Sequence, residues 1–141
     1  MDIVINYWAV LVGGIVSVVL GMIWYNPKVF GTAWIGAQGK SMDEMLAKMK
    51  VSGKSMTSQY IIQIVAALVM SYVLAHFVSL LSFVTFSAGA QLGFWLWLGF
   101  VATAMIGMVL WEGKPWKYYS IVAGYHLANM LIVGGLLAAW S

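Results

Sequence analysis

The stretch that decides the fold is residues 3–34, which read IVINYWAVLVGGIVSVVLGMIWYNPKVFGTAW. Its apolar part, Ile3–Tyr25, is too long and too apolar for a core helix of a soluble protein, and it can cross a hydrocarbon layer of about 30 Å. The Asn26-Pro27 pair then ends the helix, because proline lacks a backbone N–H and restricts the residue before it. The stretch therefore predicts a membrane-spanning helix with a sharp end.

One side of this predicted helix carries small and polar residues. At 3.6 residues per turn, that side is formed by Asn6, Ala9, Gly13, Ser17, Gly21 and Trp24. In lipid, small residues let two helix backbones approach closely and gain dispersion contacts. The small face therefore predicts contact with another helix.

The rest of the chain has the same character. Of its 141 residues, 63% are hydrophobic and 8% are charged, and the mean hydropathy is +0.93, which is typical of polytopic membrane proteins. The formal charge of +3 is small, so nucleic acid is not indicated as a partner. The absence of cysteine excludes disulfides, a thiolate nucleophile and a cysteine metal site. Because no signal-peptide pattern is present at the N-terminus, we expect the first segment to be retained.

Four apolar runs are long enough to span a membrane at about 1.5 Å per residue. They lie near Ile3–Tyr25, Gln59–Phe83, Ala88–Trp111 and Tyr118–Trp140. The prediction is an all-α membrane protein, with residues 1–141 forming a single domain in which four transmembrane helices make a compact bundle.

The lysines predict the orientation of the bundle. All seven lie in the connections after the first and third runs, at Lys28, Lys40, Lys48, Lys50, Lys54, Lys114 and Lys117. With four spans these two connections share one side, which the positive-inside rule assigns to the cytoplasm. Both termini are then expected outside.

The first lysine-rich connection has a helical pattern of its own. Ser41 and Glu44 have the spacing of a capping box. The apolar positions Met42, Met45, Leu46 and Met49 recur at helical spacing. This pattern predicts a short amphipathic helix on the inner membrane surface, in contact with lipid. The alternative is a helix packed on the cytoplasmic end of the bundle.

The other three runs also carry small residues four positions apart. These stripes are Ala67, Ser71 and Ala75; Gly99, Thr103 and Gly107; and Ser120, Gly124 and Ala128. Such stripes predict close helix packing inside the bundle. Because every helix offers a small face and the interior is limited, some stripes are alternatively expected to face a second copy of the chain or a larger membrane complex.

Polar groups inside a membrane are costly, so each is a candidate functional residue. His76 has Tyr72 as a helical neighbour, whereas Tyr125, His126 and Asn129 lie together in the fourth run. With Asn6, Ser17 and Glu112 they could form a polar line that holds or relays protons or a small solute. The alternative is that each histidine is only an interhelical tie, and that Glu112 is an interfacial carboxylate paired with lysine.

Support for catalysis is weaker. Two histidines and one glutamate on separate helices have no metal-ligand spacing, and neither a nucleophile–base motif nor a phosphate-binding loop is present. The sequence therefore predicts no enzyme activity, no metal and no cofactor, although a hydrophobic ligand in a groove is an open alternative.

Several motifs resemble those of a family of small bacterial membrane proteins catalogued as domain of unknown function 1761. They are Ile5-Asn6-Tyr7-Trp8-Ala9-Val10-Leu11, Gly21-x-x-Trp24-Tyr25-x-Pro27-x-x-Phe30-Gly31-x-x-Trp34, Tyr72-Val73-Leu74-Ala75-His76, and Trp111-Glu112-Gly113-Lys114-Pro115-Trp116-Lys117 leading to Gly124-Tyr125-His126. The resemblance covers nearly the whole chain and implies a four-helix protein of the bacterial inner membrane. It implies no activity.

The leading functional hypothesis is a small oligomeric membrane protein that binds or conducts a small solute or protons along the polar line. The alternative is an accessory subunit that docks on a larger membrane complex through its small faces. An enzyme acting on a lipid-soluble substrate is the third hypothesis.

Overall fold

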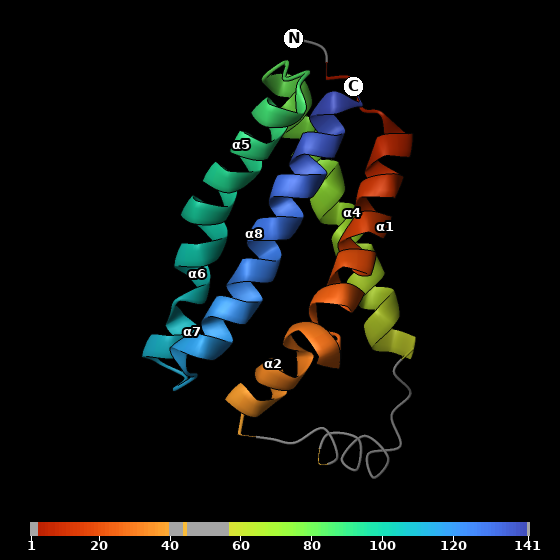
Figure 1. Cartoon of the computed structure of the whole chain (residues 1–141). Coiled ribbons are helices and arrows are strands. Elements are labelled where there is room, and N and C mark those ends of the chain that lie inside the picture. The colour runs from red at the N-terminus through yellow and green to blue at the C-terminus, as the bar shows by residue number, and fades with distance from the viewer. Residues whose placement is uncertain (1–2, 40–43, 45–56, 141) are drawn as a thin grey trace.

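The computed structural model describes residues 3–39, 44 and 57–140, and these ranges contain helices and no strand. With the labels of Figure 1, the elements are α1 (Tyr7–Trp24), the π-helical turn η1 (Pro27–Gly31), α2 (Thr32–Ala37), α4 (Thr57–Leu80), α5 (Phe86–Leu96), the π-helical turn η2 (Trp97–Ala102), α6 (Thr103–Met105), α7 (Gly107–Leu110) and α8 (Trp116–Ala139).

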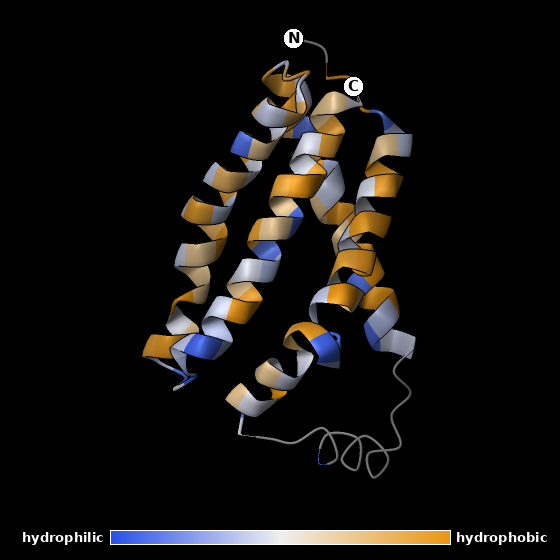
Figure 2. Cartoon of the chain, viewed as in Figure 1, coloured by the Kyte–Doolittle hydropathy of each residue, from blue (hydrophilic) through white to orange (hydrophobic). Residues whose placement is uncertain are grey.

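Four helical segments are long and apolar enough to cross a membrane. They are α1, α4, the continuous segment Phe86–Leu110 that joins α5 to α7, and α8, with lengths of 18, 24, 25 and 24 residues. At about 1.5 Å per residue these segments measure roughly 27–38 Å, which matches a hydrocarbon core. Figure 2 shows them largely hydrophobic, with hydrophilic residues near their ends and also partway along α8. The predicted all-α chain with four such helices is confirmed.

The helix ends differ slightly from the predicted ones because of capping. The first helix begins at Tyr7 and not at Ile3, because Asn6 is extended and its side chain accepts a hydrogen bond of 3.2 Å from the backbone N–H of Ala9. Asn6 therefore caps the helix instead of lying on its small face. Thr85 caps α5 in the same way, through the N–H of Ala88.

A tight turn follows α1, which ends at Trp24, just before the Asn26-Pro27 pair that predicted the end of this helix. The Asn26 side chain accepts a hydrogen bond of 2.9 Å from the N–H of Lys28, and Pro27 opens η1. Gly31 packs against the end of α1, where any side chain would collide with the carbonyl oxygen of Tyr25. Helix α2 then packs against α8, and Trp34 stacks on Tyr118 with ring centroids 6.5 Å apart.

Helix α8 is the central element. In Figure 1 it lies between α5 and the pair formed by α1 and α4, with both termini at one end of the bundle. In its most apolar window 56% of the residues are buried, against 17–28% in the other three segments. Its buried residues Val133, Leu137 and Ala138 join the main core cluster with Ala9 and Leu74.

The bundle is packed unevenly along its length. Residues 57–66, the first part of α4, are all exposed, whereas Ala67, Ser71, Leu74, Ala75 and Val78 of the same helix are buried. The core is therefore concentrated toward the termini, and the helices are less closely packed at the opposite end. The predicted amphipathic helix over residues 41–53 lies outside the described residues, apart from Glu44.

Candidate functional site

A groove of about 560 Å³ lies where the bundle is loosely packed, at the end away from the termini. We call it the α1/α4/α8 groove; it is lined by Val18, Gly21, Met22, Tyr25, Asn26 and Pro27 of α1 and the turn after it, Tyr60 and Gln63 of α4, and Tyr125 and His126 of α8. Its volume is within the usual range of about 300–1,000 Å³ for small-molecule sites.

One wall of the groove is fixed by Tyr125. Its hydroxyl group donates a hydrogen bond of 2.8 Å to the buried carbonyl oxygen of Ser17, so the ring lies across α1. Gly21 leaves room for this crossing, because a Cβ there would approach the Tyr125 hydroxyl to 3.3 Å. The ring of Tyr25 lies 5.6 Å away, centroid to centroid. The wall is therefore held by contacts inside the protein and does not depend on a ligand.

Trp24 supports this wall from behind. Its indole N–H donates a hydrogen bond of 3.0 Å to the carbonyl oxygen of Ile121 in α8. Gly124 gives the indole its space, since a Cβ at that position would lie 3.2 Å from the Trp24 ring. The two glycines Gly21 and Gly124, which the sequence assigned to helix packing, thus make room for aromatic side chains on opposite helices.

Three polar side chains of the groove are free to bind a ligand. His126 packs its ring 5.2 Å from that of Tyr125, and neither ring nitrogen has a hydrogen-bond partner in the described part of the chain. The same holds, within residues 3–39, 44 and 57–140, for the amide group of Gln63 and the hydroxyl group of Tyr60. An imidazole, an amide and a phenol each offer both a donor and an acceptor.

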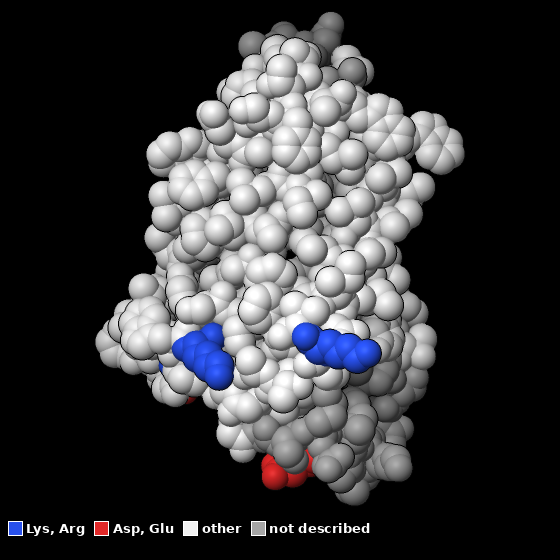
Figure 3. Space-filling view, in the orientation of Figure 1, with Lys and Arg blue, Asp and Glu red and all other residues white. Residues whose placement is uncertain are grey.

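The lining contains no charged side chain among the described residues. The described charged residues lie in or next to the connections at the same end of the bundle, at Lys28, Glu44, Glu112, Lys114 and Lys117. On the face that Figure 3 shows, the coloured charged side chains of the described residues lie in the lower part of the molecule. The groove therefore lies near the charged end, but its lining within the described ranges is neutral.

The two histidines do not belong to one cluster. His76 forms a hydrogen bond of 3.0 Å between its Nδ1 and the carbonyl oxygen of Tyr72 in its own helix, and the two rings are 4.4 Å apart. His76 lies nineteen residues after α4 begins, and His126 ten residues after α8 begins at the same end. At about 1.5 Å per residue, this places them roughly 14 Å apart along the bundle.

The other candidates of the polar line are also dispersed. Ser17 is buried and donates a hydrogen bond of 3.0 Å to the carbonyl oxygen of Gly13. Asn129 is 4% exposed, and its Oδ1 has no partner among the described residues. Glu112 is exposed in the turn before α8. Of the predicted ligand-binding residues, only Tyr125 and His126 line the groove.

Sequence reasoning missed Met22, Tyr25, Asn26, Tyr60 and Gln63. A signal for one of them existed, because Gln59 and Gln63 are amides four residues apart in an otherwise apolar run. Tyr60 and Gln63 face the end of α1 because of the way α4 is placed against the other helices, and the sequence pattern does not contain that information.

The small face of α1 and the small stripe of α4 lie between helices. Gly13 packs against the side chains of Ser71 and Val133, and the Ser71 hydroxyl group donates a hydrogen bond of 2.9 Å to the carbonyl oxygen of Val10. Ala67 and Ala75 are buried on either side of Ser71. On α8, however, Ser120 is exposed and Ala128 is half-buried.

The stripe formed by Gly99, Thr103 and Gly107 lies on the outside of the chain. Gly99 and Thr103 are exposed, Gly107 is half-buried, and a Cβ on Gly99 would meet nothing within 4 Å among the described residues. The close contact of α5 with α8 is made at other glycines: the backbone of Gly89 meets that of Gly134, and the backbone of Gly93 meets that of Met130.

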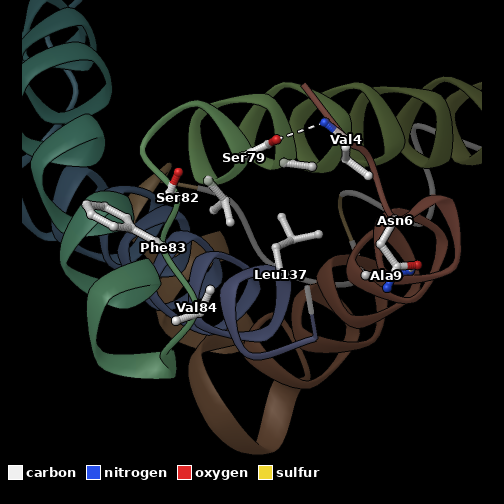
Figure 4. A pocket seen from close by; sticks show the side chains of 10 residues that line it. Val4, Asn6, Ala9, Ser79, Ser82, Phe83, Val84 and Leu137 are labelled. Carbon is white, nitrogen blue, oxygen red and sulfur yellow. Dashed lines mark hydrogen bonds between the residues drawn. The ribbon is translucent and has the colours of Figure 1, made fainter. Parts of the chain in front are cut away.

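A second, smaller cavity of about 200 Å³ lies near the termini (Figure 4). Its polar groups hold the chain ends: the N–H of Val4 donates to Ser79 Oγ at 3.0 Å, and Asn6 Nδ2 donates to the carbonyl oxygen of Trp140 at 2.7 Å. This cavity is therefore part of the closure of the bundle. Among the described residues, no group of three or more histidine, aspartate or glutamate side chains could hold a metal ion.

Comparison with known families agrees with the resemblance seen in the sequence. The model of the family described as "Protein of unknown function (DUF1761)" matches residues 8–138. No curated protein and no solved structure matches the chain. The chain belongs to the DUF1761 family.

Proposed function

We propose that this DUF1761 protein is a multi-pass membrane protein that binds a small solute in the α1/α4/α8 groove. The observation that carries the proposal is a ligand-sized groove in which the polar groups of Tyr60, Gln63 and His126 have no partner in the described chain. Its aromatic wall is held by the hydrogen bond from Tyr125 to Ser17. A wall that is already in place reduces the entropy lost on binding.

The outer surface supports a location in a membrane. Large apolar side chains are exposed along all four segments, for example Ile15 at 52%, Ile62 at 67%, Phe100 at 73% and Ile132 at 39%. Such a surface is stable in lipid and would aggregate in water. With the lysines on the cytoplasmic side, both termini lie outside the plasma membrane.

This orientation can be tested because the chain has no cysteine. We expect a membrane-impermeant maleimide to label Val84→Cys, in the turn near the termini, on intact cells. Lys117→Cys, in the first turn of α8 at the other end, should be labelled only after the cells are opened. The reverse pattern would invert the orientation.

The geometry favours binding over conduction of a solute or protons. Beyond the groove, toward the termini, Ser17, Ser71 and Val133 are at most 1% exposed and fill the space between the helices. His76, on the far side of this layer, already bonds to its own helix. These observations support a groove with a closed end, and we assign the protein no catalytic step.

The proposal is tested by filling the groove. Met22 lines it and is 69% exposed, so Met22→Trp blocks the space without disturbing the core. The matched control is Ile23→Trp, because Ile23 is the next residue, is 57% exposed and faces away from the groove. The proteins are isolated with native lipid, and their bound small molecules are released and identified by mass spectrometry.

We expect the wild type and Ile23→Trp to release the same compound in proportion to the amount of protein, and Met22→Trp to release none of it. If the three proteins release the same compounds, or if none of them releases any compound, binding in the groove is refuted.

The second candidate function is an oligomer or an accessory subunit of a larger membrane complex. The specific observation in its favour is the outward small stripe at Gly99 and Thr103. It is flanked by the exposed side chains of Leu98 and Phe100, so a partner helix could approach closely between them.

A further inference from the structure

Among the described residues, the α1/α4/α8 groove has a lining without charged side chains, although charged residues lie near it. Its polar groups are the amides of Asn26 and Gln63, the phenols of Tyr25, Tyr60 and Tyr125, and the His126 imidazole. Transfer of an ion from water to such a site, without an opposite charge to pair with, is strongly unfavourable. The lining therefore favours an uncharged ligand over a phosphate, a carboxylate or an ammonium group.

The polarity of the groove changes along the bundle. Along α1 and the turn after it, the lining begins with the apolar Val18 and Met22 and ends with Asn26 and Pro27, at the end where the described lysines lie. On α4 the polar lining residues Tyr60 and Gln63 are close to the start of the helix, at that same end. A ligand that satisfies both parts has a polar group near the membrane boundary and an apolar part directed toward the middle.

The groove is also open toward the surface that faces lipid. Met22 is 69% exposed, and Ile61 and Ile62, beside Tyr60 on α4, are 56% and 67% exposed. Because residues 57–66 are all exposed, this part of α4 does not close the groove against its surroundings. A molecule dissolved in the bilayer can therefore reach the polar groups by moving sideways between α1 and α4.

We infer, building on the proposed function, that the solute is an uncharged amphipathic lipid whose hydroxyl or carbonyl head binds Gln63 and His126. Both side chains can donate and accept, so they suit a head that carries a hydroxyl group and an ester carbonyl together. The tail then leaves the groove past Met22 into the bilayer.

The test uses a single cysteine in the groove as a reporter. Met22→Cys is the reporter and Ile23→Cys the matched control, because the two neighbours face different sides of α1. Each variant is reconstituted in phosphatidylcholine vesicles, and the rate of alkylation by N-ethylmaleimide is measured. The added probes are dioleoylglycerol, dioleoylphosphatidate at the same fraction, and water-soluble glycerol.

We expect dioleoylglycerol to slow alkylation at Met22→Cys about fivefold once about four-fifths of the grooves are filled. Alkylation at Ile23→Cys should not change, and neither phosphatidate nor glycerol should protect the reporter. In the reporter background, Gln63→Leu and His126→Leu should each raise the dioleoylglycerol needed for half protection by up to about tenfold. Gln63 is exposed, so its replacement leaves the core intact, and His126→Gln should restore most of the protection.

Equal slowing at both cysteines would indicate a change in the bilayer and would overturn the inference. Equal protection by phosphatidate would overturn the requirement for a neutral head, and no protection by dioleoylglycerol would overturn the lipid itself. Recovery of a water-soluble compound from the wild type but not from Met22→Trp would also overturn this inference while leaving the proposed binding function intact.

Discussion

The contact between α5 and α8 gives the sharpest prediction of stability. Gly93 lies directly on the backbone of Met130, and a Cβ added to Gly93 would overlap the Met130 carbonyl oxygen and lie 2.6 Å from its carbonyl carbon. These are backbone atoms of the central helix, so they cannot rotate away as a side chain would. Relief requires α5 to move outward by roughly 1 Å, to a carbon–oxygen separation of about 3.3 Å.

We therefore expect Gly93→Ala to lower the free energy of unfolding. Overpacking a close contact costs about 1–3 kcal/mol, and the better helix propensity of alanine returns up to about 1 kcal/mol. The high end of this range applies, because Gly89 and Gly134 touch in the same contact and would separate together. The net loss is about 2 kcal/mol, measured by unfolding in mixed micelles of a mild detergent and sodium dodecyl sulfate.

The matched control is Gly99→Ala, six residues further along the same segment. A Cβ at Gly99 would meet nothing within 4 Å of the described chain, so this change should leave stability unaltered or raise it by up to about 1 kcal/mol. If Gly93→Ala is as stable as Gly99→Ala in the same titration, the close backbone contact of α5 with α8 is refuted.

Three further predictions concern single side chains. Asn129→Leu should stabilise the protein by about 1 kcal/mol, because the Asn129 Oδ1 is buried without a partner in the described residues; a clear loss of stability would show that this oxygen is bonded. Tyr125→Phe should cost about 1 kcal/mol, since the hydroxyl group bonds to the Ser17 carbonyl oxygen; unchanged unfolding would contradict that bond. If the outward stripe at Gly99 and Thr103 joins copies of the chain, Gly99→Leu should shift the protein to monomer in native mass spectra, and an unchanged distribution would exclude this surface.

The number, type and order of the helices could be predicted because each depends on nearby residues. Runs of apolar residues fix the four long helices, and Asn26-Pro27 fixes the end of the first one wherever its partners lie. Capping is also local, yet the start of α1 at Tyr7 was missed, because Asn6 has helical spacing with Gly13 and also has the right chemistry for a cap. Spacing alone does not distinguish these two roles.

The choice of contact face could not be predicted in the same way. The segment from α5 to α7 contains two sets of glycines, Gly89 with Gly93 and Gly99 with Gly107, and both have the spacing of a small face. Only the first set has a matching glycine, Gly134, at the same level of the central helix. Helix packing in lipid requires complementary small sites on two helices, so it is a property of pairs that are distant in sequence.

The polar line predicted from the sequence identified only part of the groove, again because contacts between residues distant in sequence were not known. Each polar residue was identified by its cost in lipid, but that cost can be removed in several ways. His76 bonds to its own helix and Ser17 to the preceding turn, so neither residue needs a ligand to satisfy it. His126 and Gln63 have no such partner in the described chain, and the groove brings them together. In a chain with four helices this apolar, the polar groups left without a partner are therefore a better guide to a binding site than the full set of polar groups.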